Sequence, residues 1–476
     1  MKRSPLSPLL FLLLASVALA APGPKINVLF FLVDDLGWTD LGCYGSDYYE
    51  TPNIDRLASE GMRFTDAYAA FCVCSPTRAS ILTGKYPGRL RITHAIPIQG
   101  SERYGGELPL VEPIYCKNLP LEELTIAEAL KPHGYATATM GKWHVNIDDA
   151  YQPEHQGFDI NVAGGWMGNP GNYFYPYKGS WRMTKKHPLR SWRLFPDGKE
   201  GEYLTDRLTD EAVTFVEKHR NEPFFLLLSH YAVHTPLQAK KEIIRKYAAK
   251  PKGKRHNNAY YAAMIESVDQ SLGRMVKKIA ELGLADRTVI IFTSDNGGFA
   301  GATSQDPLRG NKGNFYEGGI RVPLIVKWRG VIKAGSESST PVISTDFYPT
   351  LLDLAGLPLL PQQHVDGRSL AGLLKRTGGL EREALYWHEP NYIGPNHPDA
   401  ARPCGVVRKG SWKLIESLET NRVELYDLAN DLGEAHNLAD ERPERVAEMK
   451  RMLATMREEE KVQMPTVNPR GRGSHE

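Results

Sequence analysis

The chain lacks several features that would assign it to a common class of protein. Beyond its first twenty residues no stretch is long and apolar enough for a membrane helix, no internal repeat is visible, and the five cysteines show no zinc-binding spacing. An excess of one charge is also lacking, because 58 basic residues stand against 56 acidic ones, for a formal net charge of +2. The charge balance therefore implies no broad basic surface, nucleic acid is not an expected partner, and an anionic ligand would be bound by a local cluster of cations.

The N-terminus has the pattern of a secretory signal. Lys2 and Arg3 precede an apolar run from Leu9 to Leu19, and a cut is expected after Ala20. The run is too short to span a bilayer, and because no cysteine follows it we expect no lipid anchor. Residues 1–20 are predicted to be a signal peptide, and the mature protein is predicted to be exported, either periplasmic or secreted.

Strand and helix patterns alternate along most of the chain. Five short apolar runs have the composition of strands buried on both faces, and three stretches between them have helical periodicity. The predicted strands are Lys25–Val33, Thr137–Met140, Phe224–Ser229, Thr288–Thr293 and Pro323–Lys327, and the predicted helices are Ile126–Leu130, Tyr203–His219 and Ala259–Leu282. This order predicts an α/β fold with a large, mostly parallel sheet sandwiched by helices.

Beyond about residue 378 the pattern changes to short strands of antiparallel type, followed by a helix. The strands are Ala384–Trp387, Gly405–Val407, Trp412–Ile415 and Val423–Tyr426, and the helix lies near Arg442–Glu460. We predict a main domain over residues 21–377, a small C-terminal domain of antiparallel sheet plus helix over 378–464, and a disordered polar tail over 465–476.

Polar residues follow four of the strands predicted in the main domain. They are Asp34 and Asp35 after the first, Gly141–His144 after the second, His234 beyond the third, and Asp295–Asn296 after the fourth. Ligand sites in open α/β sheets lie outside the carboxyl ends of strands, so these residues predict one site at a single edge. Lys142 and His144 are two residues apart and point the same way if the chain is extended there.

The first and last of these strand ends offer hard oxygen ligands, from Asp34, Asp35, Asp295 and Asn296. Three charged oxygens and one neutral oxygen favour Ca²⁺; Mg²⁺ is also compatible, and zinc is disfavoured because nitrogen and sulfur donors are lacking. Three carboxylates brought together without a cation would also repel one another. Asp34–Asp35 alone is equally well explained as a turn after a strand.

The stretch Phe71–Gly84 predicts a short helix whose first turn is a reaction site. Pro76 suits the opening turn and Gly84 the left-handed position just past the end, so Cys74 lies at or beside the N-cap. Unpaired N–H groups there favour an anion, and Arg78, one turn on, adds a fork of donors for oxyanions. The plainer reading is an ordinary helix start with a buried thiol.

The motif Cys74-Ser75-Pro76-Thr77-Arg78, continued to Thr83-Gly84, resembles the signature of the formylglycine-dependent sulfatases, a family that includes arylsulfatases and N-acetylgalactosamine sulfatases. Gly141–His144, His234–Pro236 and Leu308–Gly313 match further motifs of that family. The resemblance implies an alkaline-phosphatase-like fold in the main domain, which would be catalytic. It also implies that Cys74 is oxidised to formylglycine (3-oxoalanine), whose hydrate is the nucleophile.

The resemblance also implies a role for each motif residue. Cys74 would bind one Ca²⁺ together with the four oxygen ligands named above. Lys142 would hold the sulfate and the modified residue, and His144 would take a proton from the second hydroxyl to release sulfate. His234 and Lys312 would contact the sulfate and help protonate the leaving oxygen, with His234 as the proton donor.

The implied reaction is hydrolysis of a sulfate ester, with a sulfated carbohydrate as substrate and a formylglycine-generating enzyme as the maturation partner. Galactose and N-acetylgalactosamine sulfates are the first candidates. The aromatic rings of the glycine-rich loop Gly164–Tyr175 either stack on sugars or pack in the core. Two other functions stay open: a phosphonate or phosphate monoester hydrolase of the same superfamily, and a sulfated-glycan-binding protein that has lost catalysis.

Four cysteines remain once Cys74 is oxidised, namely Cys43, Cys72, Cys116 and Cys404. In an exported protein they allow up to two disulfides in three possible connectivities, and the spacing does not choose among them.

Overall fold

The computed structural model describes residues 25–98, 108–394 and 401–469. The predicted signal peptide, residues 1–20, and residues 470–476 of the predicted tail lie outside these ranges. Within them, no helix combines the length and the hydropathy needed to cross a membrane.

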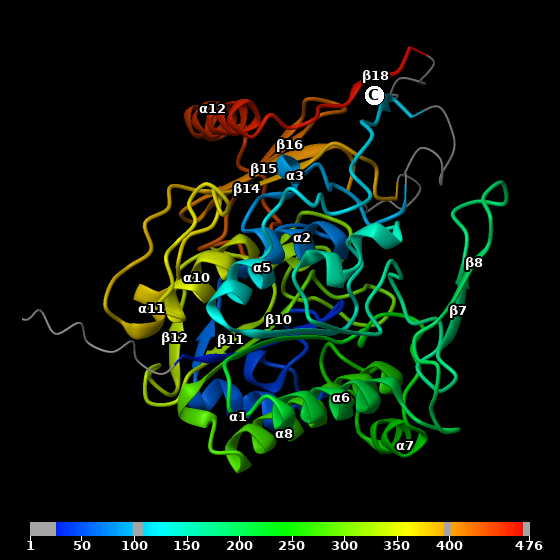
Figure 1. Cartoon of the computed structure of the whole chain (residues 1–476). Helices are drawn as coiled ribbons and strands as arrows, with labels where there is room; N and C mark the ends of the chain where they lie inside the picture. Colours follow the sequence, from blue (N-terminus) through cyan, green and yellow to red (C-terminus); the bar gives the residue numbers. More distant parts are fainter. Residues whose placement is uncertain (1–24, 99–107, 395–400, 470–476) are drawn as a thin grey trace, which may run out of the picture.

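The centre of the protein is an eight-stranded sheet (Figure 1). In spatial order its strands are β12 (Ser336–Ser338), β2 (Met62–Phe64), β11 (Leu324–Lys327), β10 (Thr288–Ser294), β1 (Asn27–Val33), β9 (Phe224–Ser229), β5 (Ala136–Gly141) and β6 (Ile160–Val162). Strands β10, β1, β9, β5 and β6 are parallel, whereas β11 is antiparallel to both of its neighbours. The prediction of a mostly parallel sheet is confirmed, and all five predicted strands are present.

Helices cover both faces of this sheet, because the central strands are apolar on both sides. In β1, Leu29, Phe31 and Val33 pack toward one layer, and the alternate residues Val28 and Phe30 pack toward the other. The first layer contains α1 (Pro52–Glu60), α6 (Leu204–Lys218), α7 (Lys241–Ala249) and α8 (Ala259–Glu281), and the second contains α2 (Cys74–Thr83), α3 (Pro87–Leu90), α5 (Ile126–Leu130), α10 (Phe347–Leu354) and α11 (Ala371–Lys375).

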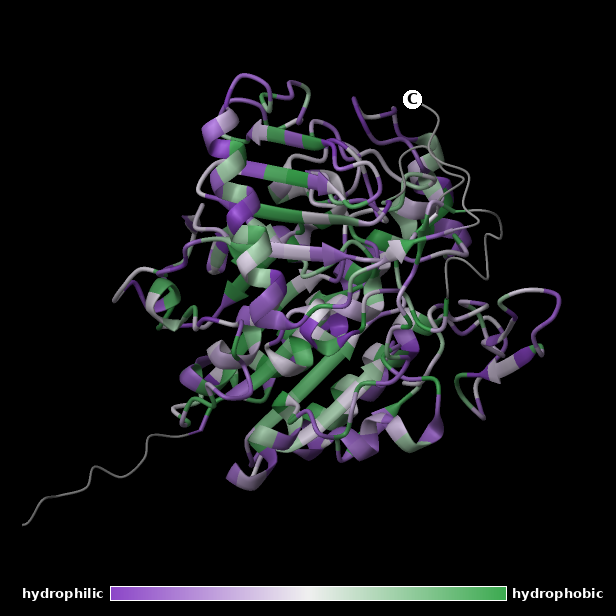
Figure 2. Ribbon diagram, turned by 90° about the horizontal axis from the view of Figure 1, so that it is seen from above, coloured by the Kyte–Doolittle hydropathy of each residue, from purple (hydrophilic) through white to green (hydrophobic). Residues whose placement is uncertain are grey.

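A second, four-stranded sheet follows in the chain. Its strands β14 (Leu385–Glu389), β15 (Cys404–Lys409), β16 (Trp412–Ser417) and β17 (Val423–Asp427) are all antiparallel, and α12 (Pro443–Glu460) covers it. Met449, Leu453 and Met456 of α12 pack against Leu414 and Leu425. Figure 2 shows apolar segments of the strands in green. The antiparallel strands and the final helix are as predicted; the boundary at residue 378 stays a prediction.

A buried ion-pair network joins this second sheet to the main domain. Lys413, on β16, places Nζ 2.9 Å from Oε1 of Glu317 and 2.8 Å from Oε1 of Glu434. Glu317 begins α9 (Glu317–Ile320), which leads into β11. Burial, followed by the charge of Glu317, raises the pKa of Glu434 to about 7.

Within the described ranges the chain also forms three small two-stranded sheets. They are β3 (Ala67–Tyr68) with β13 (Val342–Ile343), β7 (Lys178–Trp181) with β8 (Arg190–Arg193), and β4 (Leu110–Val111) with β18 (Thr466–Val467). The last pairing corrects one prediction. Thr466 and Val467 are not disordered, because they pair with Val111 and Leu110.

The five cysteines all lie in the described ranges, and all are free thiols. The two disulfides that the sequence allowed are therefore not present in this part of the chain.

Candidate active site

The predicted convergence of strand ends is present. Strands β10, β1, β9 and β5 are consecutive and parallel, so their carboxyl ends reach one edge of the sheet. Asp295 and Asn296 follow β10, and Asp34 and Asp35 follow β1. His144 has a φ of 60°, so the condition of an extended chain after β5 is not met, although Lys142 and His144 both reach the site.

Helix α2 brings Cys74 to the same edge. Val73 is its N-cap in an extended conformation, and Cys74 is the first helical residue. Gly84 ends the helix with a φ of 70°, and a Cβ at that position would lie only 2.5 Å from Cβ of His364. Every residue of α2 is buried, so packing fixes the position of the Cys74 thiol.

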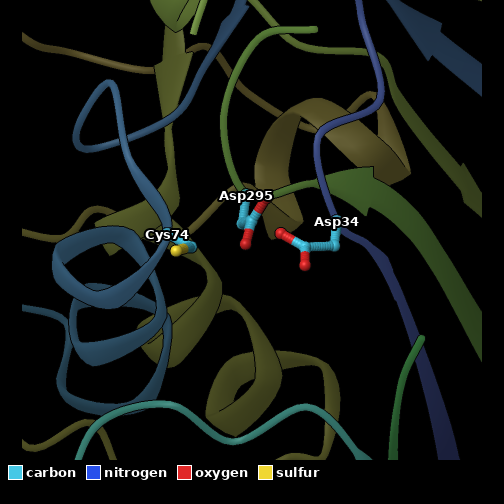
Figure 3. Close-up of side chains that lie close together, drawn as sticks. All are labelled: Asp34, Cys74 and Asp295. Atoms are coloured by element: carbon cyan, nitrogen blue, oxygen red, sulfur yellow. The ribbon is translucent and has the colours of Figure 1, made fainter. Parts of the chain in front are cut away.

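The thiol faces a group of carboxylates that fits a cation. Ligand atoms of Asp34, Cys74 and Asp295 all lie within 4.8 Å of one another (Figure 3). Asp35 joins the group through Asn296, whose Nδ2 donates to its Oδ1 at 2.8 Å. In the described part of the chain, Oδ1 of Asp34 and Oδ1 of Asn296 are buried without a hydrogen-bond donor. Arg78 Nη2 approaches Oδ1 of Asp34 only to 3.9 Å, and hard oxygens that accept no hydrogen bond suit Ca²⁺ or Mg²⁺.

Each of the three carboxylates also has a basic partner. Lys142 Nζ lies 2.7 Å from Oδ2 of Asp34, and Arg78 Nη2 lies 2.8 Å from Oδ2 of Asp295. Lys312 Nζ lies 2.7 Å from Oδ1 of Asp35, so three acids pair with three bases. Repulsion among carboxylates is therefore not a sufficient reason for a cation, contrary to our expectation. The unpaired oxygens are the better reason.

The three carboxylates differ in how strongly the surroundings favour ionisation. Burial, with the nearby charges of Asp295 and Asp35, raises the pKa of Asp34 well above its ordinary value. Burial also opposes ionisation of Asp35, but Lys312 holds the pKa of that carboxyl below its ordinary value. Burial also opposes ionisation of Asp295, but the charge of Arg78 lowers the pKa of that carboxyl. Asp34 is thus the carboxylate whose charge most needs a further positive partner.

Arg78 is directed at protein groups rather than at a ligand. Its Nε donates to Asp295 at 2.8 Å, and its Nη1 donates to the carbonyl of Lys142 at 2.8 Å and to Oγ of Ser229 at 2.6 Å. The Arg78 and Lys142 side chains are almost wholly buried and do not line the cavity described below. Ser229, the last residue of β9, was missed in the sequence because a serine in an apolar strand carries no signal of its own.

His144 is oriented as a base toward Cys74. Its Nε2–H donates to the carbonyl of Ile96 at 2.5 Å, so the lone pair of Nδ1 faces Sγ of Cys74 at 3.2 Å. Burial, followed by the charge of Lys142, lowers the pKa of His144 well below its ordinary value. The ring is therefore neutral and able to accept a proton from a group on Cys74.

His234 and Lys312 meet at Asp35. The His234 Nδ1–H donates to the carbonyl of Thr235 at 2.8 Å, which leaves Nε2 3.6 Å from Oδ2 of Asp35. Burial, followed by the charge of Lys312, lowers the pKa of His234 to about 3. Burial alone would lower the pKa of the Lys312 ammonium, but the charge of Asp35 raises that pKa. The free protein therefore carries its proton on Lys312 and not on Nε2 of His234.

A cavity of about 280 Å³ opens above these groups. The residues that line it include Cys74, His144, His234 and Lys312, together with three tryptophans, Trp166, Trp181 and Trp192. Aromatic residues of the glycine-rich loop Gly164–Tyr175 have both of the roles considered above. Trp166 lines this cavity, whereas Tyr173 packs in the core, with its ring centroid 5.9 Å from that of Tyr203. Trp181 and Trp192 were not predicted, because they lie on the separate hairpin of β7 and β8.

Comparison with known proteins gives a consistent result. Residues 26–357 match the family described as Sulfatase, and residues 311–461 match the family described as N-sulphoglucosamine sulphohydrolase, C-terminal. The chain is 35% identical to a protein named Sulfatase from Formosa agariphila, over 88% of this chain and 85% of the relative. It is 33% identical to human N-acetylgalactosamine-6-sulfatase, over 89% of this chain and 79% of the relative.

Among solved structures, the chain resembles Ps i-CgsB in complex with k-i-k-neocarrahexaose. The TM-score is 0.73 at 30% identity, and the match covers 91% of this chain and 92% of that one.

Proposed function

Since this chain belongs to the sulfatase family and is a sulfuric ester hydrolase, we propose that it removes sulfate from a sulfated carbohydrate by means of a formylglycine at Cys74 and one bound Ca²⁺. We further propose that it is exported, with residues 1–20 as its signal peptide, and that a formylglycine-generating enzyme oxidises Cys74. Galactose and N-acetylgalactosamine sulfates remain the first candidate substrates. The name N-acetylgalactosamine-6-sulfatase of a relative supports this choice.

The observation that carries the proposal is the position of Cys74. Its Sγ lies at the start of a buried helix, 3.2 Å from Nδ1 of His144 and within one ligand group with Asp34 and Asp295. Sγ stands where an oxygen of the formylglycine hydrate would be. That hydrate supplies an oxygen nucleophile for sulfur, and the N–H groups of the helix start favour the anion that it meets.

The residues around the carboxylate group suit the proposed cation. Asp34, Asp35, Asp295 and Asn296 would hold it together with the modified Cys74, and the unpaired oxygens of Asp34 and Asn296 support this assignment. A bound Ca²⁺ would offset negative charge on the sulfate oxygens. Arg78 and Lys142, which pair with Asp295 and Asp34, would then act as positioning residues that hold two of the ligands in place.

Three groups remain to act on the substrate. Lys312 lines the cavity with an ammonium that stays charged, so it would bind a sulfate oxygen. His144, with a free lone pair toward Cys74, would remove the proton whose loss releases sulfate and regenerates the aldehyde. His234 would give a proton to the leaving oxygen. His234 is neutral in the free protein, so the negative charge of the bound ester would have to raise its pKa enough for Nε2 to gain that proton.

Release of free sulfate from a panel of defined sulfated mono- and oligosaccharides tests the proposal. Matched phosphate and phosphonate monoesters of the same alcohols serve as the comparison. Faster cleavage of the phosphorus esters would identify a phosphonate or phosphate monoester hydrolase instead. Binding of the saccharides without release of sulfate, in protein that carries an unmodified Cys74, would identify a glycan-binding protein.

A further inference from the structure

The hairpin of β7 and β8 lies in a stretch with an unusual charge for this chain. Residues 160–196 contain no Asp or Glu, and they contain six basic residues: Lys178, Arg182, Lys185, Lys186, Arg190 and Arg193. The whole chain has a formal net charge of only +2. The hairpin projects from the body of the protein (Figure 1), and this concentration of positive charge projects with it.

The two faces of the hairpin differ. Gly179 pairs with Trp192, and Trp181 pairs with Arg190, so these four residues share one face, which is half-buried. The alternate residues, which include Lys178 and Arg193, are exposed on the other face. This period of two shows that the hairpin presents its tryptophans inward and two of its cations outward.

The inward face forms part of the active-site cavity. Trp181 and Trp192 line it together with Cys74 and His234. The Trp192 ring lies edge-on to that of Trp166, with centroids 5.3 Å apart, and the Arg190 guanidinium lies 4.1 Å above the Trp166 ring. A Cβ at Gly179 would lie 2.2 Å from the Trp192 ring, so a glycine is needed there for the ring to lie across the hairpin.

Three cations lie at the tip of the hairpin. Arg182, Lys185 and Lys186 are exposed, and in the described part of the chain none of them forms an ion pair with a carboxylate. Three neighbouring cations beside the wall of a sulfate-ester site attract an anion that extends beyond that site. A single sugar sulfate that fills the cavity has no further charge to offer them, whereas a sulfated oligosaccharide does.

We propose that the β7–β8 hairpin is a substrate-binding arm for a carbohydrate that carries more than one sulfate. Its inward tryptophans hold the sugar that bears the reacting ester, and its basic tip binds sulfate groups on neighbouring sugars. This inference rests on the proposed function and narrows it, because it makes multiply sulfated oligosaccharides the preferred substrates over single sugar sulfates and aryl sulfates.

The test compares two substrates in a tip variant, Arg182→Gln with Lys185→Gln and Lys186→Gln. On a carrageenan hexasaccharide, loss of three exposed charge contacts is expected to raise KM about tenfold, with little change in kcat, and to weaken the dependence of kcat/KM on salt. On nitrophenyl sulfate, which cannot reach the tip, both constants should stay unchanged. Lys178→Gln, which removes one charge from the outward face, is the matched control and should leave KM unchanged on both.

An unchanged KM and salt dependence for the tip variant on the hexasaccharide would overturn the inference. Binding measured by calorimetry separates it from the proposed function. If Cys74→Ser protein binds the hexasaccharide and the tip substitutions weaken that binding about tenfold, the hairpin is a binding arm even if no sulfate is released by the wild type. If Cys74→Ser protein binds equally well with and without the tip substitutions, or does not bind at all, the inference is wrong.

Discussion

Replacing His234 with alanine is expected to slow release of sulfate from a sugar much more than from nitrophenol. A sugar hydroxyl is a poor leaving group and needs a proton as its bond to sulfur breaks, whereas nitrophenol leaves readily as an anion. General acid catalysis contributes about 10²–10⁴-fold, or about 3–5 kcal/mol of the barrier. Because Lys312 lines the same cavity and keeps its proton, it can replace part of the lost effect. We therefore expect a loss of about 10²-fold on the sugar and only a few-fold on nitrophenyl sulfate.

The matched comparison is His144→Ala. Nδ1 of His144 lies 3.2 Å from the Cys74 sulfur and would act after the alcohol has left, so its loss should slow both substrates by the same factor. His219→Ala is the control, since that histidine pairs with Glu222 before β9 begins, at the end of the sheet opposite the site, and should leave both rates unchanged. The assay is kcat for each variant on a sugar sulfate and on nitrophenyl sulfate, with free sulfate as the common product.

An equal loss on both substrates in His234→Ala would refute the assignment. The residue would then only hold the sulfate, and Lys312 would be the proton donor. Lys312→Gln would in that case show the dependence on leaving group that His234→Ala lacks.

Four further predictions concern the site and the fold. Mass spectrometry of the peptide that contains Cys74 should show oxygen in place of sulfur, and an active preparation that carries only thiol would contradict the mechanism. Chelation should remove activity and Ca²⁺ should restore it, whereas Asp295→Ala should abolish metal binding in elemental analysis. Lys413→Met should lower the free energy of unfolding by about 3–5 kcal/mol, because it removes the cation that pairs with buried Glu434 and leaves buried Glu317 with Arg321 alone; a loss below 1 kcal/mol by chemical denaturation would contradict this. Burial, followed by the charge of Asp366, raises the pKa of Glu460 to about 9. The folded protein therefore keeps a proton that the unfolded chain loses above about pH 4.5, and the stability of the wild type should fall as pH rises from 5 to 9. Glu460→Gln lacks this proton, so it should become more stable relative to wild type over that range, by at most about 1.4 kcal/mol per pH unit. Thermal unfolding of both proteins measures the difference.

The features that the sequence predicts well are local ones. Strand β1 consists of Asn27 and six apolar residues, and Asp34 follows directly after Val33, so neighbouring residues in the sequence indicate both the strand and its polar end. The α2 helix is similar, because Pro76 and Gly84 mark its two ends and Cys74 begins it. The mostly parallel sheet and the meeting of four strand ends follow from such signals by a general rule of α/β folds.

The features that were missed depend on distant partners or on weak local patterns. Strand β11 lies beside the last of the parallel strands and is antiparallel to both of its neighbours. Its apolar composition identifies it as a strand but does not indicate its direction. Strands β7 and β8 contain four residues each, with Gly, Ser, Lys and Arg beside the tryptophans, so they have neither an apolar run nor a turn motif of the usual kind. The orientation of Arg78 was also not predictable, because its partner Asp295 lies 217 residues away.

The paired charges at the site affect how any substitution there must be interpreted. Removing Arg78 or Lys142 would leave a buried carboxylate without its partner, which costs about 3–5 kcal/mol in addition to any effect on catalysis. Lost activity in Arg78→Ala would therefore not distinguish a sulfate-binding arginine from one that holds Asp295. Arg78→Lys keeps the charge but loses the fork that reaches Asp295, the Lys142 carbonyl and Ser229 together. If Arg78 is a positioning residue, this variant should stay folded and bind Ca²⁺ more weakly, with KM for a sugar sulfate unchanged when Ca²⁺ is saturating. A raised KM under those conditions would instead mean that Arg78 binds the sulfate directly.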